Sequence, residues 1–386
     1  MRKKVAVLSS SRADFNYLRL ILKKISASNE LDLSLLITGT HLLEKYGMTK
    51  KFIEIDNIPI TKTIDMYDPG DLSKVALGKA VGKGIINFTI ALNDIKPDLL
   101  LVLGDRYEIL AVVIAASTLR IPIAHIHGGD NVSYGQVDEQ IRHAITKFAH
   151  IHFPATSKSA ERIRLFGEEE WRIHMVGSPS IDHIYQEKFA SKTEICTKLG
   201  LSDDLEILVC ILHPYTIESE KAGEQMGMIL KILKDFGFQS VILYPNNDPG
   251  SDLIINEIQQ NIDNPNFKIF KNLSYYDYYS LLSNANLLIG NSSSGLIESP
   301  ILKLPVVNIG DRNKGRESAE NVINVPYDAN LIKEAIKKGM TPEFKKKCEK
   351  VINPYGDGKA SERIVKIIED LKIDKNLLIK KLTFNV

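Results

Sequence analysis

Short apolar runs alternate with longer amphipathic stretches along most of the chain. Apolar runs of about four to eight residues between turn-forming residues predict buried strands. We expect them in two series, Val5–Ser9, Leu31–Thr38, Asp98–Leu103, Ile121–Ile126, Ile151–Pro154 and Ile173–Val176, then Glu206–Leu212, Ser240–Tyr244, Phe267–Phe270, Leu287–Gly290 and Pro305–Ile309. Helical apolar spacing lies between them, for example at Leu18–Ile25, Gly78–Ile95 and Gln225–Phe236. Such alternation predicts parallel sheets with helices on both faces.

The length of 386 residues favours two domains of about 150–200 residues over one core. Gly177-Ser178-Pro179 can continue neither a strand nor a helix, and the second strand series starts after it. We therefore expect an α/β fold of two Rossmann-like, doubly wound domains that face a central cleft, as in the glycosyltransferase-B arrangement. Residues 1–176 would form the first domain, completed by a C-terminal helix within 360–386, and residues 177–359 the second.

Composition and charge narrow the class of protein. The chain is 44% hydrophobic and 25% charged, which is typical of globular proteins. A formal net charge of +1 gives no electrostatic reason to expect a nucleic acid or a membrane as partner. No apolar run approaches the roughly 18–20 residues of a membrane helix, and we expect no signal peptide. Three cysteines without metal-like spacing suggest a reduced, cytoplasmic protein.

Polar side chains follow the first and third predicted strands. Arg12 lies in the run Ser9–Asp14, where hydroxyls and amides before a helix can hold an anion. A simple helix cap with a surface arginine explains the same run. Asp105 and Arg106 come directly after the third predicted strand and Gly104, and would project from the carboxyl end of the sheet. A helix-capping role for Asp105 is the alternative.

The densest polar cluster is HIHGGDNVSYGQVDEQIRH, from His125 to His143. His125 and His127 would face the same side of an extended strand, and with Asp130 they could bind a metal such as zinc. No third ligand stands out, so we expect no metal, and a core role for His125 stays open. Asp138 is placed to pair with an arginine one helical turn on, as in ordinary surface ion pairs.

Asp105 and Asp138 follow strands that we expect to be neighbours in one sheet. Two carboxylates beside a histidine can divide acid and base roles when their environments separate their pKa values. We therefore treat Asp105, His127 and Asp138 as candidate catalytic residues.

A second cluster predicts phosphate binding in the second domain. The strand Leu287–Gly290 enters the small-residue turn Asn291–Gly295, in which Ser292, Ser293 and Ser294 could bind phosphate. This turn matches neither a Walker motif nor GxGxxG, which disfavours P-loop NTPases and dehydrogenases. Glu298 could accept hydrogen bonds from ribose hydroxyls, or simply favour the start of a helix.

Basic side chains end other strands of the second series. His213, Arg312 and Arg316 could neutralise a diphosphate, although each could equally be a loop residue. Asn246 lies in a similar place, in Tyr244-Pro245-Asn246-Asn247.

Taken in order, these motifs resemble the hydrolysing branch of the UDP-N-acetylglucosamine 2-epimerase family. The resemblance rests on SSRADF, TGTHLL, GDRYE, HIHGGD with GQVDEQIRHAITK, GSPSID, HP, YPNNDPG, GNSSSG and GDRNKGRESAENV. Non-hydrolysing members typically have HVEAGLRS where this chain has HIHGGDNVS, and this difference favours hydrolysis. Animal sialic-acid enzymes have glutamate at position 127.

The resemblance assigns residues to a UDP-sugar. It implies that UDP is held by Arg12, Asn16, Arg106, His213, Asn246, Ser292, Ser293, Glu298 and Arg312, with the backbone near Leu273 against uracil. Asp105, His127 and Asp138 would surround C1 and C2 of the sugar. No cofactor is implied.

The implied reaction removes the C2 proton while UDP leaves C1, which gives a glycal, and water then adds to give the 2-epimeric free sugar. UDP-N-acetylglucosamine is the first candidate substrate, with N-acetylmannosamine for sialic acid synthesis as product. UDP-2,4-diacetamido-2,4,6-trideoxyglucose, for legionaminic acid, is the alternative. Two other classes stay open: a glycosyltransferase, which would need an acceptor, and a non-catalytic sugar-nucleotide sensor. We also expect a homo-oligomer, a dimer or a tetramer.

Overall fold

The computed structural model describes residues 2–44, 48–68, 70, 71, 73, 75–131, 137–245 and 248–384. Contacts divide these residues into two compact units. Unit 1 contains the described residues up to 183 and those from 355 onward, and unit 2 contains residues 184–354. Whether the chain folds as two independent domains with the predicted bounds stays a prediction.

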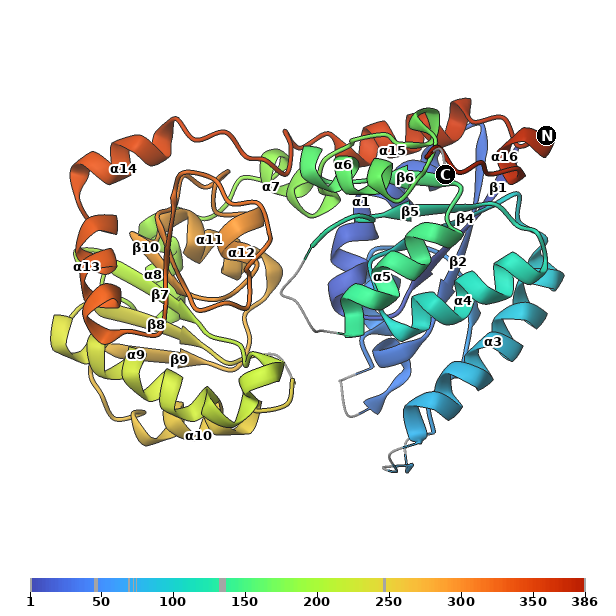
Figure 1. Cartoon of the computed structure of the whole chain (residues 1–386). Helices are drawn as coiled ribbons and strands as arrows, with labels where there is room; N and C mark the ends of the chain where they lie inside the picture. The colour runs from blue at the N-terminus through green and yellow to red at the C-terminus, as the bar shows by residue number, and fades with distance from the viewer. Residues whose placement is uncertain are drawn as a thin grey trace. The chain divides into compact units, whose positions relative to one another are not determined.

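A six-stranded parallel sheet forms the centre of unit 1, with the strand order β3-β2-β1-β4-β5-β6 (Figure 1). The strands are β1 (Lys3–Ser9), β2 (Leu31–Ile37), β3 (Ile60–Thr63), β4 (Leu99–Leu103), β5 (Ile123–Ile126) and β6 (Ile151–Phe153). The helices of this unit are α1 (Arg12–Ala27), α2 (Lys50–Ile55), α3 (Ala76–Ile95), α4 (Tyr107–Thr118), α5 (Val137–Phe148), α6 (Ser157–Leu165), α15 (Ala360–Asp370) and α16 (Lys375–Leu378).

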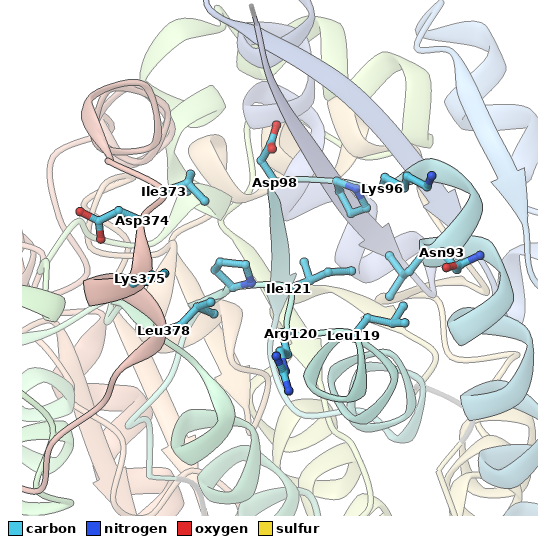
Figure 2. A pocket seen from close by; sticks show the side chains of 13 residues that line it. Asn93, Lys96, Asp98, Leu119, Arg120, Ile121, Ile373, Asp374, Lys375 and Leu378 are labelled. Atoms are coloured by element: carbon cyan, nitrogen blue, oxygen red, sulfur yellow. The ribbon is translucent and has the colours of Figure 1, made fainter.

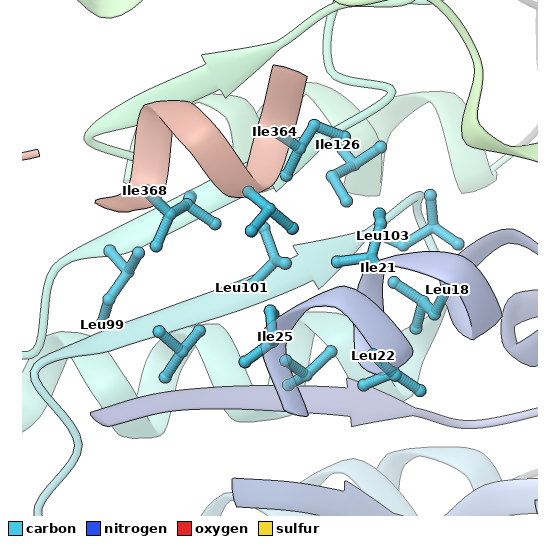
Figure 3. Close-up of a cluster of buried hydrophobic side chains, with 14 of the residues drawn as sticks. Leu18, Ile21, Leu22, Ile25, Leu99, Leu101, Leu103, Ile126, Ile364 and Ile368 are labelled. Carbon is cyan, nitrogen blue, oxygen red and sulfur yellow. The ribbon is translucent and has the colours of Figure 1, made fainter. Parts of the chain in front are cut away.

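Helices cover both faces of this sheet, because both faces of its strands are apolar. On one face the buried side chains of α1 and α15 pack on β1, β4 and β5 (Figure 3). Ile364 and Ile368 bring α15 into this core, although they are far in sequence from Leu101 beneath them. On the other face α3, α4 and α5 pack on the alternate side chains of the same strands, such as Leu100 and Val102.

Unit 2 repeats the topology, with the strand order β12-β11-β10-β7-β8-β9 in a second parallel sheet. The strands are β7 (Ile207–Ile211), β8 (Gln239–Leu243), β9 (Phe267–Phe270), β10 (Leu287–Gly290), β11 (Val306–Ile309) and β12 (Val322–Val325). Its helices are α8 (Lys192–Leu199), α9 (Ala222–Phe236), α10 (Ser251–Gln260), α11 (Tyr275–Asn284), α12 (Ser294–Ile297), α13 (Ala329–Gly339) and α14 (Pro342–Glu349), and α7 (Asp182–Gln186) spans the boundary between the units.

The core of unit 2 also has two layers. Side chains of α9, α10 and α13 pack on one face of the sheet, and those of α8 and α11 pack on the other. The predicted fold class, two doubly wound Rossmann-like sheets, is therefore confirmed. Within the described ranges, no helix combines the length and apolar character needed to cross a membrane.

Three strand predictions need correction. The strand predicted at Ile173–Val176 is wrong, because Ile173 makes only an isolated bridge to His152. The sequence pattern missed β3 and β12, which are edge strands of the two sheets. These two edge strands are only partly buried, which weakens the apolar pattern by which a buried strand is recognised.

Each sheet reverses its strand order at one place, between β1 and β4 in unit 1 and between β7 and β10 in unit 2. Ligands of open α/β sheets bind outside the carboxyl ends of the strands at such a switch point. A functional site is therefore expected in the chain segments that follow β1, β4, β7 and β10.

Candidate active site

Asp105 and Arg142 form the charged centre of the unit 1 site, defined here as Asp105, His127, Asp130, Arg142 and Ser178. Asp105 follows β4, and its carboxylate forms an ion pair with Arg142 of α5. Arg142 is only 4% exposed, and it also donates to the carbonyl oxygen of Asp130 at 3.0 Å. A buried guanidinium stabilises the ionised form of a neighbouring carboxylate. Asp105 is thus held as an anion at the switch point.

His125 is a buried, neutral core residue. Its Nε2 lies 2.8 Å from the carbonyl oxygen of Gly104, so Nε2 carries the proton, and its Nδ1 lies 3.3 Å from Thr146 Oγ1. Burial lowers the pKa of His125 to about 3. The alternative of a core role for His125 therefore fits the structure.

His127 stands apart from the strand that precedes it. β5 ends at Ile126, and His127 has a φ of 63°, so the extended strand on which two histidines would share a face does not reach His127. Its Nδ1 lies 2.8 Å from Asp130 Oδ2, and its Nε2 lies 3.0 Å from Ser178 Oγ. The H-x-H metal alternative loses its geometric basis, and the described residues contain no group of three metal-ligating acids, histidines or cysteines.

Asp138 lies in the first turn of α5 and is exposed. Because Arg142 follows it by four residues, the two side chains share one face of the helix. Arg142 therefore connects the helix face of Asp138 to the carboxylate of Asp105. The catalytic role of Asp138 stays a prediction.

Arg12 and Arg106, which are predicted to bind UDP, contact other side chains of unit 1. Arg12 begins α1 and lies 5.3 Å from the centre of the Phe52 ring. Asn16 is half-buried on the same helix. Burial works against the charge of Arg106, but the carboxylates of Glu108 and Asp14 outweigh it and raise the pKa of Arg106. Arg106 Nε lies 3.2 Å from Glu108 Oε2.

Asn291 fixes the switch point of unit 2. It follows β10, and its side chain bridges to the end of β7 by accepting from the backbone N–H of His213 at 2.7 Å and donating to the His213 carbonyl at 2.8 Å. The Asn291 carbonyl in turn accepts from Arg312 Nη1 at 3.0 Å and from Asn313 Nδ2 at 2.9 Å. One buried asparagine thus brings together three strand ends.

Two arginines give this site its charge. We define the unit 2 site as His213, Asn291, Glu298, Arg312 and Arg316. Burial and the charge of Arg316 lower the pKa of Arg312 to about 10. Arg316 Nη1 is buried without a hydrogen-bond partner among the described residues. Two neighbouring cations with a free buried donor are suited to an anion with several oxygens.

His213 and Glu298 complete the unit 2 site. Burial and the charge of Arg312 lower the pKa of His213 to about 3, so the imidazole is neutral in this state and can donate only a hydrogen bond. Burial raises the pKa of Glu298, whose Oε2 is buried without a hydrogen-bond partner among the described residues. An acceptor of this kind suits a hydroxyl donor, as the predicted ribose contact requires.

The serine turn differs from its prediction in one respect. Ser292, Ser293 and Ser294 lie after Asn291 as expected, but the helix that they open, α12, is a single turn of four residues. Pro300 disfavours helical geometry at the residue before it, and the turn ends at Glu298. A helix this short adds little dipole, so phosphate binding would depend on the amides and on the arginines.

Leu273 and Asn246 are the remaining residues predicted to bind UDP. Leu273 is half-buried after β9 and packs on the unit 2 core. Asn246 lies outside the described residues.

Sequence reasoning missed the residues that hold the site together. Asn291 was seen only as part of a turn, Ser178 only as part of a boundary, and Arg142 only as a surface pair. All three are buried. The signal for Asn291 and Ser178 was their place in GNSSSG and GSPSID, although the pattern alone does not say what they contact.

A pocket of about 540 Å³ lies elsewhere in unit 1, at the amino ends of β4 and β5 (Figure 2). Lys96 and Arg120, which line it, precede these two strands. The side chains of the unit 1 site follow the opposite ends of the strands. This pocket is therefore separate from the unit 1 site.

The sequence profile described as UDP-N-acetylglucosamine 2-epimerase matches residues 23–369. The chain belongs to this family. A UDP-N,N'-diacetylbacillosamine 2-epimerase (hydrolyzing) from Legionella pneumophila is 36% identical over 380 residues, 98% of this chain and 99% of that protein. A UDP-N-acetylglucosamine 2-epimerase from Neisseria meningitidis is 30% identical over 335 residues, 86% of each chain.

Solved structures of the family share the fold. The crystal structure of UDP-GlcNAc 2-epimerase from Neisseria meningitidis bound to UDP-GlcNAc matches with a TM-score of 0.84 and 21% identity, over 95% of this chain and all of that one. The resemblance read from the motifs is thus confirmed at the level of family and fold.

Proposed function

We propose that the protein is a hydrolysing UDP-sugar 2-epimerase, which converts a UDP-2-acetamido sugar and water into UDP and the free 2-epimeric sugar. The proposal assigns UDP to the unit 2 site and the sugar chemistry to the unit 1 site. Relatives with hydrolysing 2-epimerase names match nearly the whole chain and support it.

The observation that carries the proposal is the pair Arg312 and Arg316 beside the turn that Asn291 fixes. Repulsion between the two neighbouring, partly buried cations costs free energy in the unliganded protein, and an anion removes that cost. A diphosphate offers several oxygens to the two guanidinium groups, to the serine amides and to the His213 imidazole. The free Glu298 Oε2 gives the ribose an acceptor.

The reaction requires both acid–base groups and a site that binds the leaving UDP. A carboxylate takes the C2 proton, the C1–O bond breaks with its electron pair on UDP, and a C1–C2 double bond forms. Water then adds its oxygen at C1 and a proton returns at C2. Because the C2 proton is weakly acidic, stabilisation of the leaving UDP has to lower much of the barrier. Asp105, His127 and Asp138 are the proposed groups at the sugar.

Two substrates of this class deserve direct comparison. UDP-2,4-diacetamido-2,4,6-trideoxyglucose is favoured by the name of the Legionella relative at 36% identity, and UDP-N-acetylglucosamine by the name of the Neisseria relative at 30%. The products would supply legionaminic acid or sialic acid synthesis, respectively. The two substrates differ at C4 and C6, so the ratio of their kcat/KM values decides between them.

The decisive experiment incubates the purified protein with each UDP-sugar in D2O and follows UDP and free sugar by NMR. Released UDP together with a manno-configured sugar that carries deuterium at C2 is the expected result. A UDP-sugar that epimerises without UDP release would place the protein in the non-hydrolysing branch. UDP release only with an added sugar acceptor would make it a glycosyltransferase, and binding without turnover would make it a sensor.

The role of Asp138 is tested by Asp138→Asn. We expect turnover to fall at least about a hundredfold while UDP still binds, because general acid–base groups contribute about 10²–10⁴ to the rate. Asp94→Asn on α3, which removes an exposed ion pair with Lys62, is the matched control and should leave turnover unchanged. Unchanged turnover in Asp138→Asn would remove this residue from the mechanism.

We also propose a homo-oligomer in the cytoplasm. Exposed Ile86 and Ile90 lie one turn apart on α3, and such apolar surface supports self-association. The buried free cysteines of the described chain, Cys196, Cys210 and Cys348, support a reducing compartment. Sedimentation of the purified protein checks the oligomer, and a monomer at micromolar concentration would contradict it.

A further inference from the structure

His127 has a strained backbone that several side chains hold in place. Its φ of 63° is uncommon for a residue other than glycine. The loop behind it is tied to three elements, since Arg142 donates to the Asp130 carbonyl, Arg162 donates to the Gly129 carbonyl at 2.8 Å, and the His127 N–H donates to Phe153 at 3.1 Å. Strain that the surrounding structure maintains is typical of functional positions.

Both nitrogens of the His127 ring have partners of different character. Nδ1 faces the carboxylate of Asp130 at 2.8 Å, and Nε2 faces the hydroxyl of Ser178 at 3.0 Å. The Tyr17 ring packs against the imidazole in a T-shaped arrangement, with the ring centres 5.5 Å apart. The imidazole is therefore fixed in its plane and in its orientation.

The hydrogen bonds can be given directions, because an ionised carboxylate only accepts. Nδ1 of His127 must then donate to Asp130, which leaves Nε2 of the neutral ring as an acceptor for the Ser178 hydroxyl proton. Ser180 Oγ lies 2.9 Å from Ser178 Oγ and supplies the next donor. At the other end, Ser159 Oγ donates to Asp130 Oδ1 at 2.7 Å.

We propose that Asp130 and Ser178 are positioning residues that fix the tautomer of His127, with the proton on Nδ1 and the basic nitrogen Nε2 bonded to Ser178. The arrangement resembles a serine–histidine–aspartate triad in its order of groups. Ser178 is nevertheless fully buried, so its hydroxyl orients the histidine rather than attacking a substrate.

The expected effect of Ser178 on the reaction rate rests on the proposed function. The expected tautomer of His127 does not depend on it. A group that acts on the sugar has to be held to within about 0.5 Å, and loss of such positioning can cost about a hundredfold in rate. Because UDP is assigned to the unit 2 site, loss of the Ser178 hydroxyl should lower kcat and leave KM unchanged.

The first measurement uses the unaltered protein with ¹⁵N-labelled histidine, and His127→Asn to assign the signal. The expected state in long-range ¹H–¹⁵N spectra is a His127 ring with its proton on Nδ1 and none on Nε2. In Ser178→Ala the Nε2 signal should move as it loses a donor, while the Nδ1 signal stays. A proton on Nε2 in the unaltered protein would overturn the inference, even if Ser178→Ala did not fold.

The second measurement compares UDP release by Ser178→Ala, Ser178→Thr and Ser34→Ala. Ser34 of β2 is also a buried serine and serves as the control. We expect kcat to fall at least tenfold in Ser178→Ala, to recover with the threonine hydroxyl, and to be unchanged in Ser34→Ala. A kcat of Ser178→Ala equal to that of Ser34→Ala would refute the positioning role. If the unaltered protein releases no UDP from any sugar, the proposed function fails, and the tautomer measurement still decides the inference.

Discussion

Burial lowers the pKa of Arg312, and the neighbouring cation of Arg316 lowers it further in the unliganded protein. Nearby acids offset part of the repulsion between the two arginines. The charge of Asp248 favours protonation of Arg312, and Arg316 lies close enough to Glu298 to lower the pKa that burial of Glu298 raises. Like charges gathered in this way reduce stability and are retained where function needs them.

Arg316→Met should separate binding from stability. Loss of a charged hydrogen-bond donor to the diphosphate should weaken UDP binding at least tenfold, since bonds to charged groups contribute about 1.5–3 kcal/mol. The free energy of unfolding should change by less than about 1 kcal/mol, because lost repulsion with Arg312 offsets lost attraction to Glu298. Titration calorimetry and urea denaturation measure the two quantities.

The matched control for this change is Lys314→Met. Lys314 lies in the same loop, but it forms an exposed ion pair with Asp311 and should alter neither quantity. Equal UDP affinities for the two variants would remove Arg316 from the UDP site.

UDP binding should be coupled to protonation of His213. In the free protein the pKa of His213 is about 3, so the ring is neutral. A bound diphosphate replaces the unfavourable influence of Arg312 with a negative charge and raises this pKa. Because the pKa is higher in the complex than in the free protein, the affinity for UDP should rise as the pH falls through the pKa of the complex, and binding should take up a proton.

Calorimetry in two buffers of different ionisation enthalpy gives the number of protons taken up at pH 6. The terminal phosphate of UDP also titrates near this pH, so the informative quantity is the difference between the unaltered protein and His213→Asn. We expect fewer protons taken up by the variant. The same number for both proteins would show that His213 stays neutral next to UDP.

The fold could be predicted from apolar periodicity because a doubly wound sheet is built from local units. Each buried strand, such as Leu99–Leu103, reads as an apolar run, and each helix between strands has its own spacing. The edge strands β3 and β12 escaped because one or both of their faces meet solvent. The short length of α12 could have been predicted from Pro300, but the prediction for this turn considered only its serines.

The site could be predicted only in part, because its contacts join residues that no local pattern relates. His127 and Ser178 are 51 positions apart, and Asn291 reaches a backbone 78 positions away. Residue types at strand ends indicate which groups gather at the switch point. Which of them face each other is decided by loop conformation, such as the positive φ of His127.

Gly290→Ala should be strongly destabilising. Gly290 ends β10 with a φ of 130°, and an added Cβ would lie 2.0 Å from the backbone oxygen of Ile211 on β7. Both the backbone strain and this overlap oppose the side chain, so we expect a loss of at least about 2 kcal/mol in the free energy of unfolding. UDP affinity should fall as well, because Asn291 would be displaced from His213.

Gly82→Ala provides the contrast for this prediction. Gly82 lies within α3 with open space around its Cβ position, so alanine should stabilise the protein by about 0.5–1 kcal/mol. Urea denaturation of the three proteins tests both signs. A Gly290→Ala protein as stable as the unaltered one would show that the end of β10 can shift away from β7.

Removal of Arg142 should abolish turnover without affecting UDP binding. Arg142→Met leaves the Asp105 carboxylate without its buried countercharge and frees the Asp130 carbonyl. Breaking a buried ion pair by removing one partner costs about 3–5 kcal/mol. The free energy of unfolding should fall by up to this amount, because water solvates the partly exposed Asp105 and reduces the loss.

Arg164→Met, which breaks the exposed pair with Glu170, should cost less than about 1 kcal/mol. UDP titration then checks that unit 2 is intact. A variant that releases UDP from the UDP-sugar at the normal rate would show that the ion pair between Arg142 and Asp105 is not needed in the reaction.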